Sequence, residues 1–400
     1  MILKGKKIVL AVCGGIAAFK TAETASMLRK QGAEVKCIMT KNATEFITPL
    51  TMREITGNPV SVSMWTDVPN WNVEHIALAT WADVFVVAPA TANIIGKIAG
   101  GIADDMLSTT IMATKAPVIL APAMNSNMFL NPIVQDNLAK LRRFGYIILE
   151  PASGHLACGT TGIGRLPESA EIVSFVNFTL GKSDLLAGKK VIVTAGGTRE
   201  SIDPVRYIGN HSSGRMGYSI AAAAAMAGGD VTLVSAVTDL PTPLGVKRID
   251  VGSTLEMKQA VDSLYDDCDL VIKAAAVADY RVKQPAKEKI KKSEDTLTLQ
   301  LEKNPDILFG LGQRKTHQVL VGFAAETTNV LEYGRGKLVK KNLDMLVAND
   351  VSKEGAGFSV TTNIATLLYP DGSSEPLSKM EKEELAAIIV DRAGKLIKNR

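Results

Sequence analysis

Cysteine is scarce in this 400-residue chain, which contains only Cys13, Cys37, Cys158 and Cys268. These residues lie far apart and never form a CxxC pair, so neither a disulfide framework nor a zinc site is indicated and a reducing compartment fits best. Proline is also infrequent, with 16 residues beside 33 glycines, in a composition close to average globular usage. Collagen-like, low-complexity and wholly disordered chains are therefore excluded.

An excess of one charge is missing as well. The 45 basic and 41 acidic residues leave a net charge of +4, which the two halves share about equally. Because a dedicated nucleic-acid binder carries a basic tail or face, nucleic acid is not an expected partner. No run approaches the ~20 apolar residues that cross a bilayer. Residues 4–19 imitate a secretory signal, but Gly14-Gly15 interrupts them and no cleavage pattern follows, so we expect a cytoplasmic protein without a membrane partner.

Short β-branched runs alternate with helical patterns along a chain long enough for two domains of roughly 100–200 residues. Because the runs are continuously apolar, they predict parallel strands buried between two layers of helices. A polar stretch at 181–184, followed by a second strand and glycine turn, predicts domains 1–185 and 186–400, both α/β with doubly wound parallel sheets. The predicted strands are 8–12, 35–39, 84–88, 118–121 and 146–149, then 189–195, 231–234, 270–274, 319–323 and 345–348.

Hairpins are predicted at the edge of the second sheet or extending from it. Residues 296–301 alternate as an exposed strand does. Tyr369-Pro370-Asp371-Gly372 is typical of a turn between two strands.

Two predicted strands end in paired glycines, Gly14-Gly15 and Gly196-Gly197, each before a helical pattern. Backbone N–H groups and the positive end of a helix dipole favour a phosphate there, so nucleotide-like ligands are predicted in both halves. The alternative is that the glycines only relieve crowding in a tight turn. Neither turn is a GxGxxG or Walker A motif, which argues against a tandem dinucleotide-binding oxidoreductase.

Small and amide-bearing residues follow two successive strands, in the segments 88–93 (APATAN) and 121–125 (APAMN). Open α/β sheets bind ligands at the carboxyl ends of their strands, so these segments predict a pocket for a planar heterocycle or a carboxylate. The alternative is that the asparagines only cap helices or turns.

Two reactive side chains stand out in the first half. His75 precedes a helical stretch and is either a base or donor at a pocket mouth or a structural residue. Cys158 lies in residues 154–165, a segment that is too glycine-rich for a helix or strand and is predicted to be a mobile flap. With Arg165 nearby, the thiol suits a proton donor or nucleophile, whereas the other three cysteines are predicted to be core residues.

A carboxylate and a dense positive run follow a strand in the second half. Asp279 comes after strand 270–274, and residues 287–292 contain four lysines. This combination suits a nucleoside triphosphate: the Asp279 carboxylate would bind a sugar hydroxyl or a metal, and a lysine would stabilise charge on the phosphates. The alternative is that these charged residues only form a solvated edge of the domain.

Several motifs occur together along nearly the whole chain. In the first half they are residues 14–20 (GGIAAFK), His75, residues 122–125 (PAMN) and the segment around Cys158. In the second half they are residues 194–200 (TAGGTRE), 202–206 (IDPVR), 210–217 (NHSSGRMG) and 289–292 (KIKK). In this order the sequence resembles a bifunctional bacterial enzyme family of coenzyme A biosynthesis, in which phosphopantothenoylcysteine decarboxylase is joined to phosphopantothenate–cysteine ligase.

The resemblance implies that the first half is a flavodoxin-like FMN domain that forms trimers with flavin sites at subunit contacts. His75 is implied to assist substrate oxidation, Asn125 and Met124 to hold the substrate carboxylate, and Cys158 to supply a proton, with Arg165 also at the substrate. In the implied reaction FMN oxidises the cysteine moiety, carbon dioxide leaves, and the reduced flavin returns the aminoenethiol to 4′-phosphopantetheine. The implied FMN-binding residues are Gly14, Gly15, Thr40, Ala88, Thr91 and Asn93.

The second half resembles a Rossmann-like ligase that uses CTP to convert the carboxylate of 4′-phosphopantothenate into an acyl cytidylate, which the cysteine amine attacks. Asn210 is implied to support conversion of this intermediate and Lys289 to stabilise charge as it forms. Mg²⁺ is expected with CTP, without an identified ligand set, and ligase dimers with decarboxylase trimers are expected to close into a homododecamer. The implied nucleotide or substrate residues are Arg206, Ala275, Asp279, Asn304, Pro305, Asp306, Ile307, Phe323, Lys337 and Lys341, with 304–307 opening a helix and the last two lysines on one helical face.

One residue departs from the family pattern. Thr160 follows Cys158-Gly159 where many relatives carry an acidic residue. Because Cys158, Gly162, Gly164 and Arg165 remain, we expect altered flap ordering rather than loss of activity. Some proteins that resemble the first half are regulatory flavin-binding subunits, an alternative that the intact ligase half disfavours.

Overall fold

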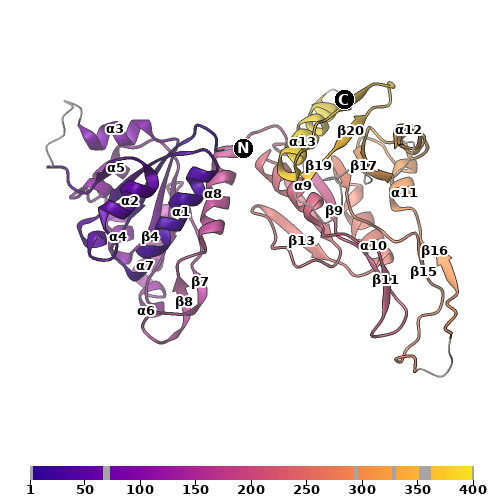
Figure 1. The fold of residues 1–400 in the computed structure, drawn as a ribbon, viewed down its shortest axis with the longest axis horizontal. Helices are drawn as coiled ribbons and strands as arrows, with labels where there is room; N and C mark the ends of the chain where they lie inside the picture. Colours follow the sequence, from indigo (N-terminus) through magenta and orange to yellow (C-terminus); the bar gives the residue numbers. More distant parts are fainter. Residues whose placement is uncertain (1–2, 66–72, 292–295, 327–329, 351–361, 399–400) are drawn as a thin grey trace. The chain divides into compact units, whose positions relative to one another are not determined.

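A computed structural model describes residues 3–65, 73–291, 296–326, 330–350 and 362–398. The chain divides into two compact units, Met1–Gly181 and Lys182–Arg400 (Figure 1). No helix within these ranges is long and apolar enough to span a membrane.

The described part of the first unit has a six-stranded parallel sheet with the order β3-β2-β1-β4-β5-β6. Without the two-residue edge strand β3, the order corresponds to the 2-1-3-4-5 arrangement of flavodoxin-like folds, as the resemblance implied. The strands are β1 (Lys7–Val12), β2 (Glu34–Met39), β3 (Val60–Ser61), β4 (Val84–Ala90), β5 (Val118–Pro122) and β6 (Ile147–Ile148).

Helices cover both faces of this sheet, which explains why its strands are apolar throughout. Ile8 and Leu10 of β1 face a core shared with α1, α2 and α8, whereas Val9 and Ala11 face a core shared with α3, α4, α5 and α7. The helices are η1 (Ile16–Ala18), α1 (Phe19–Lys30), η2 (Lys41–Glu45), α2 (Pro49–Thr56), α3 (Glu74–Trp81), α4 (Ala92–Gly100), α5 (Met106–Ala113), α6 (Ser126–Phe129), α7 (Pro132–Arg143) and α8 (Ser169–Gly181).

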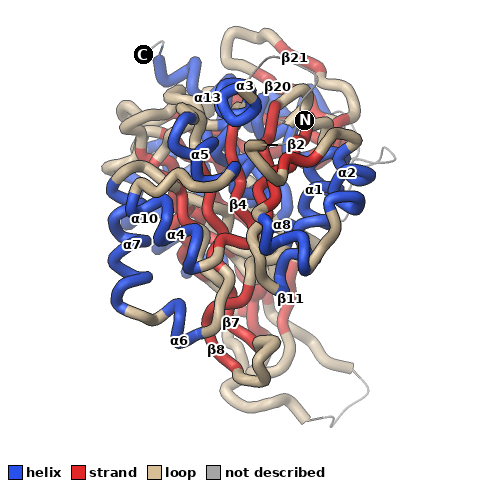
Figure 2. The backbone as a smooth tube through the Cα atoms, turned by 90° about the vertical axis from the view of Figure 1, so that its left-hand side faces the viewer, coloured by secondary structure: helices blue, strands red, loops and turns tan. Residues whose placement is uncertain are grey.

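A separate antiparallel hairpin, β7 (Ala152–His155) and β8 (Thr161–Arg165), extends beyond the sheet in the first unit (Figure 1 and Figure 2). The prediction that residues 154–165 are too glycine-rich for a strand is therefore wrong. Glycine reduces strand stability but does not prevent ladder pairing, and Gly154 pairs directly with Gly162.

The described part of the second unit has an eight-stranded sheet with the order β13-β12-β9-β14-β17-β18-β20-β21. Its first six strands are parallel and follow the 3-2-1-4-5-6 order of Rossmann folds, while β20 and β21 extend the edge in antiparallel fashion. The strands are β9 (Lys190–Ala195), β12 (Asp230–Ser235), β13 (Val246–Asp250), β14 (Leu270–Lys273), β17 (Val319–Glu326), β18 (Met345–Asp350), β20 (Ala365–Leu368) and β21 (Ser374–Pro376).

Helices α10, α11 and α12 pack on one face of this sheet, and α9 packs with α13 and the sheet. The helices are α9 (Arg215–Met226), α10 (Thr254–Tyr265), α11 (Ile307–Gln313), α12 (Val330–Lys340) and α13 (Lys382–Lys398). Short antiparallel pairs join β10 (Arg199–Ser201) with β11 (Tyr207–Gly209), β15 (Tyr280–Val282) with β16 (Leu301–Lys303), and β19 (Thr362–Asn363) with β22 (Met380–Glu381).

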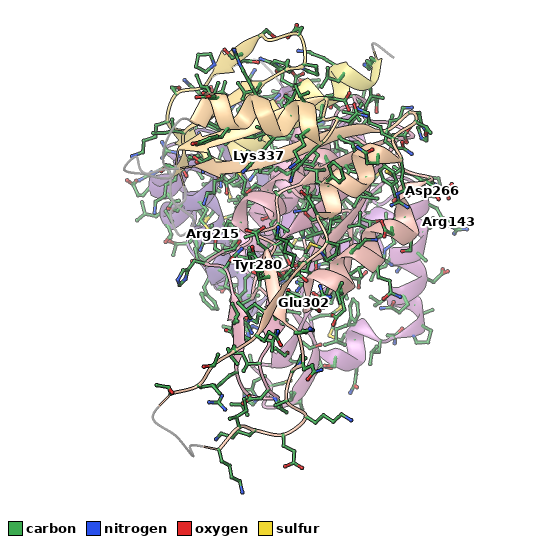
Figure 3. All side chains as sticks on the ribbon, turned by 90° about the vertical axis from the view of Figure 1, so that its right-hand side faces the viewer. Arg143, Arg215, Asp266, Tyr280, Glu302 and Lys337 are labelled. Carbon is green, nitrogen blue, oxygen red and sulfur yellow. The ribbon has the colours of Figure 1, made fainter. Side chains whose placement is uncertain are left out.

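The predicted turn at 369–372 joins β20 to β21 at the sheet edge, as expected. The strand predicted at 296–301 is wrong, because residues 296–300 are irregular and β16 begins at Leu301. The alternating residues at 296–300 are mostly solvent-exposed, and the ladder between β16 and β15 (Tyr280–Val282) begins where Leu301 lies opposite Val282. Figure 3 shows Tyr280 and Glu302 on the two strands of this hairpin.

Candidate functional sites

A cleft of about 950 Å³ lies in the first unit at the carboxyl ends of β1, β4 and β5. Nearly all residues predicted for the flavin and decarboxylation site line it: Gly14, Gly15, Thr40, Thr91, Asn93, Met124, Asn125, Cys158 and Arg165. Ala88 does not; it is buried inside β4, where its carbonyl oxygen accepts a hydrogen bond from the Thr21 hydroxyl (2.7 Å).

Local backbone geometry shapes this cleft. A Cβ atom on Gly14 would lie 2.6 Å from Cβ of Asn42, so the glycine lets two loops approach. The Thr40 hydroxyl caps η2, the Thr91 hydroxyl caps α4, and the Asn125 side chain caps α6. Thr40, Thr91 and Asn125 therefore cap helices and also line the cleft, because each cap follows a strand end that opens into it.

The β7–β8 hairpin places Cys158 over Asn125. The Asn125 amide nitrogen Nδ2 donates to Sγ at 3.3 Å, and the Thr160 Oγ1 lies 3.2 Å from Sγ. Hydrogen bonds from the Thr160 side chain, then its backbone, and then Asn125 lower the pKa of this exposed thiol. By contrast Cys13, Cys37 and Cys268 are buried, as predicted, and burial raises the pKa of each to about 12.

Two hydrogen bonds fix the hairpin to the loop after β5. The Met124 backbone N–H donates to the Gly164 carbonyl (2.9 Å), and the Ser126 hydroxyl donates to the Ile163 carbonyl (2.7 Å). Gly164 has φ +131°, and a Cβ there would lie 2.2 Å from the Met124 carbonyl oxygen. Only glycine fits this contact.

Two predicted residues are arranged differently from the sequence-based expectation. The Arg165 guanidinium donates to Glu168 at 2.7 Å, and Glu168 also binds Lys20. His75 lies in the first turn of α3, which packs on α5 at the opposite end of the unit from the hairpin (Figure 1). Within one chain His75 is therefore not brought to the cleft, whereas His155, which sequence reasoning did not select, lines it.

The cleft suits a planar aromatic cofactor with an anionic tail. Its size lies within the range of cofactor pockets. Ile16 and Phe19 supply exposed apolar surface, and the extended backbone at Gly15 leads into η1. Lys20 and Lys41 provide positive charge along the same wall. These features favour a flavin with its phosphate near the glycine turn.

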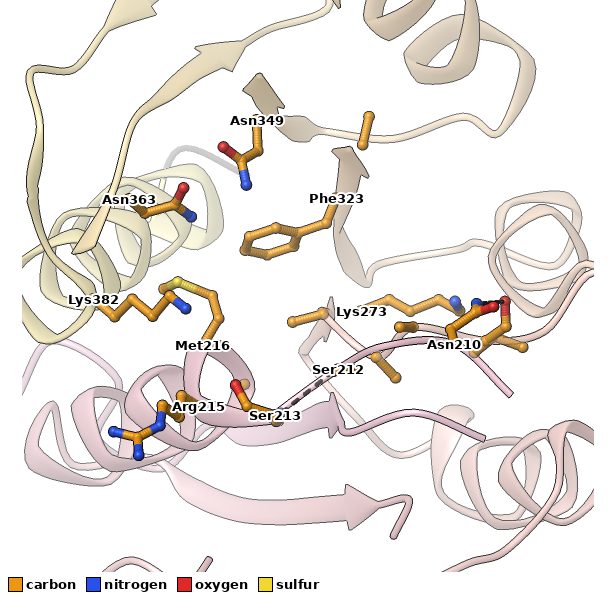
Figure 4. A pocket seen from close by; sticks show the side chains of 17 residues that line it. Asn210, Ser212, Ser213, Arg215, Met216, Lys273, Phe323, Asn349, Asn363 and Lys382 are labelled. Atoms are coloured by element: carbon orange, nitrogen blue, oxygen red, sulfur yellow. Dashed lines mark hydrogen bonds between the residues drawn. The ribbon is translucent and has the colours of Figure 1, made fainter. Parts of the chain in front are cut away.

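The second unit has a pocket of about 280 Å³ at the carboxyl ends of β14, β17 and β18 and the amino end of α9 (Figure 4). Three cations, Arg215, Lys273 and Lys382, and no carboxylate occur among its described lining residues. Such a pocket favours an anionic ligand. Of the predicted residues it contains Asn210, Ala275 and Phe323, and the Asn210 amide donates to the Val277 carbonyl at 3.1 Å.

Lys273 connects this pocket to further predicted residues. Burial and the nearby Lys341 charge lower the pKa of Lys273 to about 8, against the opposing effect of Asp306 and Asp279. Lys341 pairs with Asp306 at 2.8 Å, and Asp306 caps α11. Sequence reasoning missed Lys273, although its position at a strand end was a usable signal.

The 304–307 segment opens a helix, as predicted. The Asn304 amide donates to the Ala278 carbonyl at 2.9 Å, with Pro305 between it and the helix cap. The Ile307 side chain is buried in the apolar core, so only the backbone of this residue is left for a ligand. Lys337 lies on α12 (Figure 3), and Lys341 follows its last residue, Lys340. The Lys341 backbone N–H donates to the Lys337 carbonyl at 3.0 Å, so the two residues keep the predicted helical spacing.

Arg206 and Lys289 lie outside the described pocket lining. The Arg206 guanidinium binds the buried Asp203 through Nε at 2.9 Å and the Ile290 carbonyl at 2.8 Å. Asp203 also accepts the Ile290 N–H at 3.1 Å. In one chain Arg206 therefore anchors the exposed segment that carries Lys289.

Comparisons with known proteins give the same division of the chain. The flavoprotein family model matches residues 2–181, and the model for the C-terminal domain of the DNA/pantothenate metabolism flavoprotein matches residues 186–396. The coenzyme A biosynthesis bifunctional protein CoaBC of Vibrio cholerae is 50% identical over 393 residues, covering 97% of this chain and 98% of the relative. The chain belongs to this bifunctional family of coenzyme A biosynthesis.

Other relatives agree. The Bacillus subtilis CoaBC protein is 45% identical over 400 residues, covering 99% of this chain and 98% of the relative. A crystal structure of the C-terminal domain of a CoaBC protein is 43% identical, covers 55% of this chain and all of that chain, and has a TM-score of 0.48. The protein is a bifunctional enzyme with ligase and decarboxylase activities, and its first half is a flavoprotein.

No group of three or more potential histidine, cysteine or carboxylate metal ligands occurs within the described ranges.

Proposed function

We propose that residues 1–185 decarboxylate 4′-phosphopantothenoylcysteine with FMN, and that residues 186–400 form this compound from 4′-phosphopantothenate and cysteine with CTP. The observation that carries the proposal for the first half is the Asn125–Cys158 contact at 3.3 Å over the cleft. It joins an amide that can hold a carboxylate to a thiol that can deliver a proton.

In the decarboxylase, Gly14, Gly15, Thr40, Thr91 and Asn93 would hold FMN. Bound FMN supplies reversible two-electron oxidation. Asn125 and Met124 orient the substrate carboxylate so that carbon dioxide leaves over the cleft, and Arg165 or Lys20 adds positive charge for the phosphate. Cys158 protonates the enethiol carbon after carbon dioxide is lost, and the hairpin excludes water from that intermediate. His75 would act only if a second subunit brings it to the cleft, which agrees with trimer formation.

In the ligase, the three cations of the pocket lining, Arg215, Lys273 and Lys382, support binding of phosphates and of the activated carboxylate. The carboxylate attacks the α-phosphorus of CTP, pyrophosphate leaves, and the cysteine amine then displaces CMP from the acyl cytidylate. The Asn210 amide lines the pocket and would hold the acyl group. Lys273 would meet the phosphates, and its charge is influenced by the nearby Lys341, Asp306 and Asp279. If Mg²⁺ accompanies CTP, the Asp279 carboxylate would help to hold it, and the ion would neutralise phosphate charge.

Lys289 is exposed and outside the pocket of its own chain. We propose that it serves the site of a partner subunit in a ligase dimer. Dimers of this half and trimers of the first half would close into a dodecamer, and we propose that the enzyme works in the cytoplasm.

The test is mass spectrometry of the products formed from 4′-phosphopantothenate, cysteine, CTP and Mg²⁺. We expect 4′-phosphopantetheine, carbon dioxide and pyrophosphate. With Cys158→Ser, ligation continues and an oxidised, decarboxylated intermediate accumulates, whereas with Lys289→Gln pyrophosphate release stops and FMN stays bound. Pyrophosphate release that does not depend on CTP would refute the ligase proposal, and normal turnover by Cys158→Ser would refute the proton-donor role.

A further inference from the structure

Thr160 stands at the turn of the β7–β8 hairpin, beside the reactive sulfur. Its Oγ1 lies 3.2 Å from Cys158 Sγ. The backbone of the turn is fixed by the Leu156 N–H donating to the Thr160 carbonyl (2.8 Å) and the Gly159 N–H donating to the Leu156 carbonyl (2.9 Å). The contact between hydroxyl and sulfur is therefore built into the turn.

The two side chains around the sulfur differ in what they can donate. The Asn125 Nδ2 carries only donors, so it always donates to Sγ. The Thr160 hydroxyl can accept from the thiol or donate to the thiolate. A sulfur that loses its proton between these groups keeps the Asn125 donor and gains Thr160 as a second donor without any movement of the chain, which favours the charged form.

Several charged groups around the cleft are paired with one another. Glu168 binds both Lys20 and Arg165, and Lys97 binds Asp104 and Asp105. The hydrogen bonds at Sγ, and not an adjacent charge, account for the lowered pKa of the thiol. The titratable side chains that line the cleft with Cys158 are Cys13, Lys20, Lys41, Lys97, Asp105, His155 and Arg165.

We propose that Thr160 is a positioning residue of the decarboxylase, which holds the Cys158 sulfur and donates to it once the sulfur has released its proton to the substrate. The inference rests on the proton-donor role proposed above. In the step concerned, the Sγ–H proton would move to one carbon of the enethiol double bond, and bound reduced flavin would supply a hydride to the other carbon. The C=C π bond, the S–H bond and the hydride-bearing N–H bond of the flavin would break, two C–H bonds would form, the flavin would return to its oxidised state, and the thiolate would regain a proton from water.

The experiment measures the rate of iodoacetamide alkylation of the full-length, FMN-loaded protein against pH. Cys13, Cys37 and Cys268 are each 1% exposed, so alkylation of the folded protein reports Cys158. Three variants are compared with the parent: Thr160→Val removes the hydroxyl and keeps the branched shape, Thr160→Ser keeps the hydroxyl, and Thr161→Val is the matched control. The Thr161 hydroxyl, on the next residue, makes no hydrogen bond within the described part of the chain.

We expect Thr160→Val to need a higher pH for half-maximal alkylation and to react about three- to tenfold more slowly at neutral pH, as loss of one hydrogen bond to a charged acceptor predicts. Its decarboxylation kcat should fall with an unchanged KM, while Thr160→Ser and Thr161→Val keep the parent profile. An unchanged alkylation profile in Thr160→Val, or an equal change in Thr161→Val, would overturn the proposal. A Cys158→Ser variant that turns over normally would instead overturn the underlying proton-donor role, whatever the alkylation profiles show.

Discussion

Replacing Gly164 with alanine should detach the β7–β8 hairpin from the cleft. The new Cβ would lie 2.2 Å from the Met124 carbonyl oxygen, whereas ordinary C···O contacts are about 3.3 Å or longer. The strand must therefore withdraw by roughly 1 Å. This movement breaks the hydrogen bond from the Met124 N–H to the Gly164 carbonyl and weakens the one from Ser126 to Ile163.

The magnitude follows from these contacts. Two hydrogen bonds contribute about 0.5–1.5 kcal/mol each. At the Gly164 φ of +131° a side chain adds about 1–3 kcal/mol of strain, because only glycine adopts this backbone region readily. The free energy of hairpin docking should thus fall by about 2–6 kcal/mol. Gly159→Ala is the matched control in the same hairpin, since its φ is +85° and a Cβ there would meet nothing within 4 Å.

The assay is hydrogen exchange of the backbone amides of residues 152–165, read beside denaturant unfolding of the first unit. All three tryptophans, Trp65, Trp71 and Trp81, belong to that unit, so their fluorescence follows its unfolding alone. We expect Gly164→Ala to lose hairpin protection and decarboxylase activity, with ligase activity retained. Equal protection in Gly164→Ala and Gly159→Ala would refute the argument from close approach.

Three further predictions concern the second unit. Lys273→Met should weaken substrate binding by the ligase and make the second unit more stable at pH 7, as measured by calorimetry. The folded pKa of Lys273, about 8, lies below the unfolded value of 10.5, so the parent protein gains stability as the pH rises from 8 to 10.5. The variant should lose this rise. Asp203→Asn should abolish ligation while changing the melting temperature little. Hydrogen bonds hold the pKa of the Asp203 carboxyl below its usual 3.8, so its contacts with Arg206 and Ile290 should persist at neutral pH in the parent protein. They should be lost only as the pH falls through the folded pKa. Gly312→Ala, whose Cβ would lie 2.0 Å from the Lys341 carbonyl oxygen, should impair CTP binding, whereas Gly310→Ala in the same helix has free space and should not, as measured by calorimetric titration.

Much of the sheet architecture was predictable because strands carry a local signature. The continuous apolar runs at 8–12 and 84–88 became β1 and β4, since both of their faces are buried. Glycine content misled at 154–165, where pairing with the opposite strand outweighed weak intrinsic strand propensity. The burial of the Ile307 side chain in the core under α11 was not part of the prediction, which took this residue from the family resemblance.

The amino-acid order alone was sufficient for the α/β class, the two-part division, the glycine turns and the reactive Cys158. Only the tertiary structure decided which side chains contact one another, because contacts between distant residues depend on strand order and on the docking of the hairpin. Thr160 and Asn125 become partners of one sulfur only when β8 pairs with β7 beside the end of β5. Likewise, packing around the second sheet buries Lys273 and so lowers its pKa. Packing of α3 separates His75 from the cleft, and no local sequence pattern encodes either arrangement.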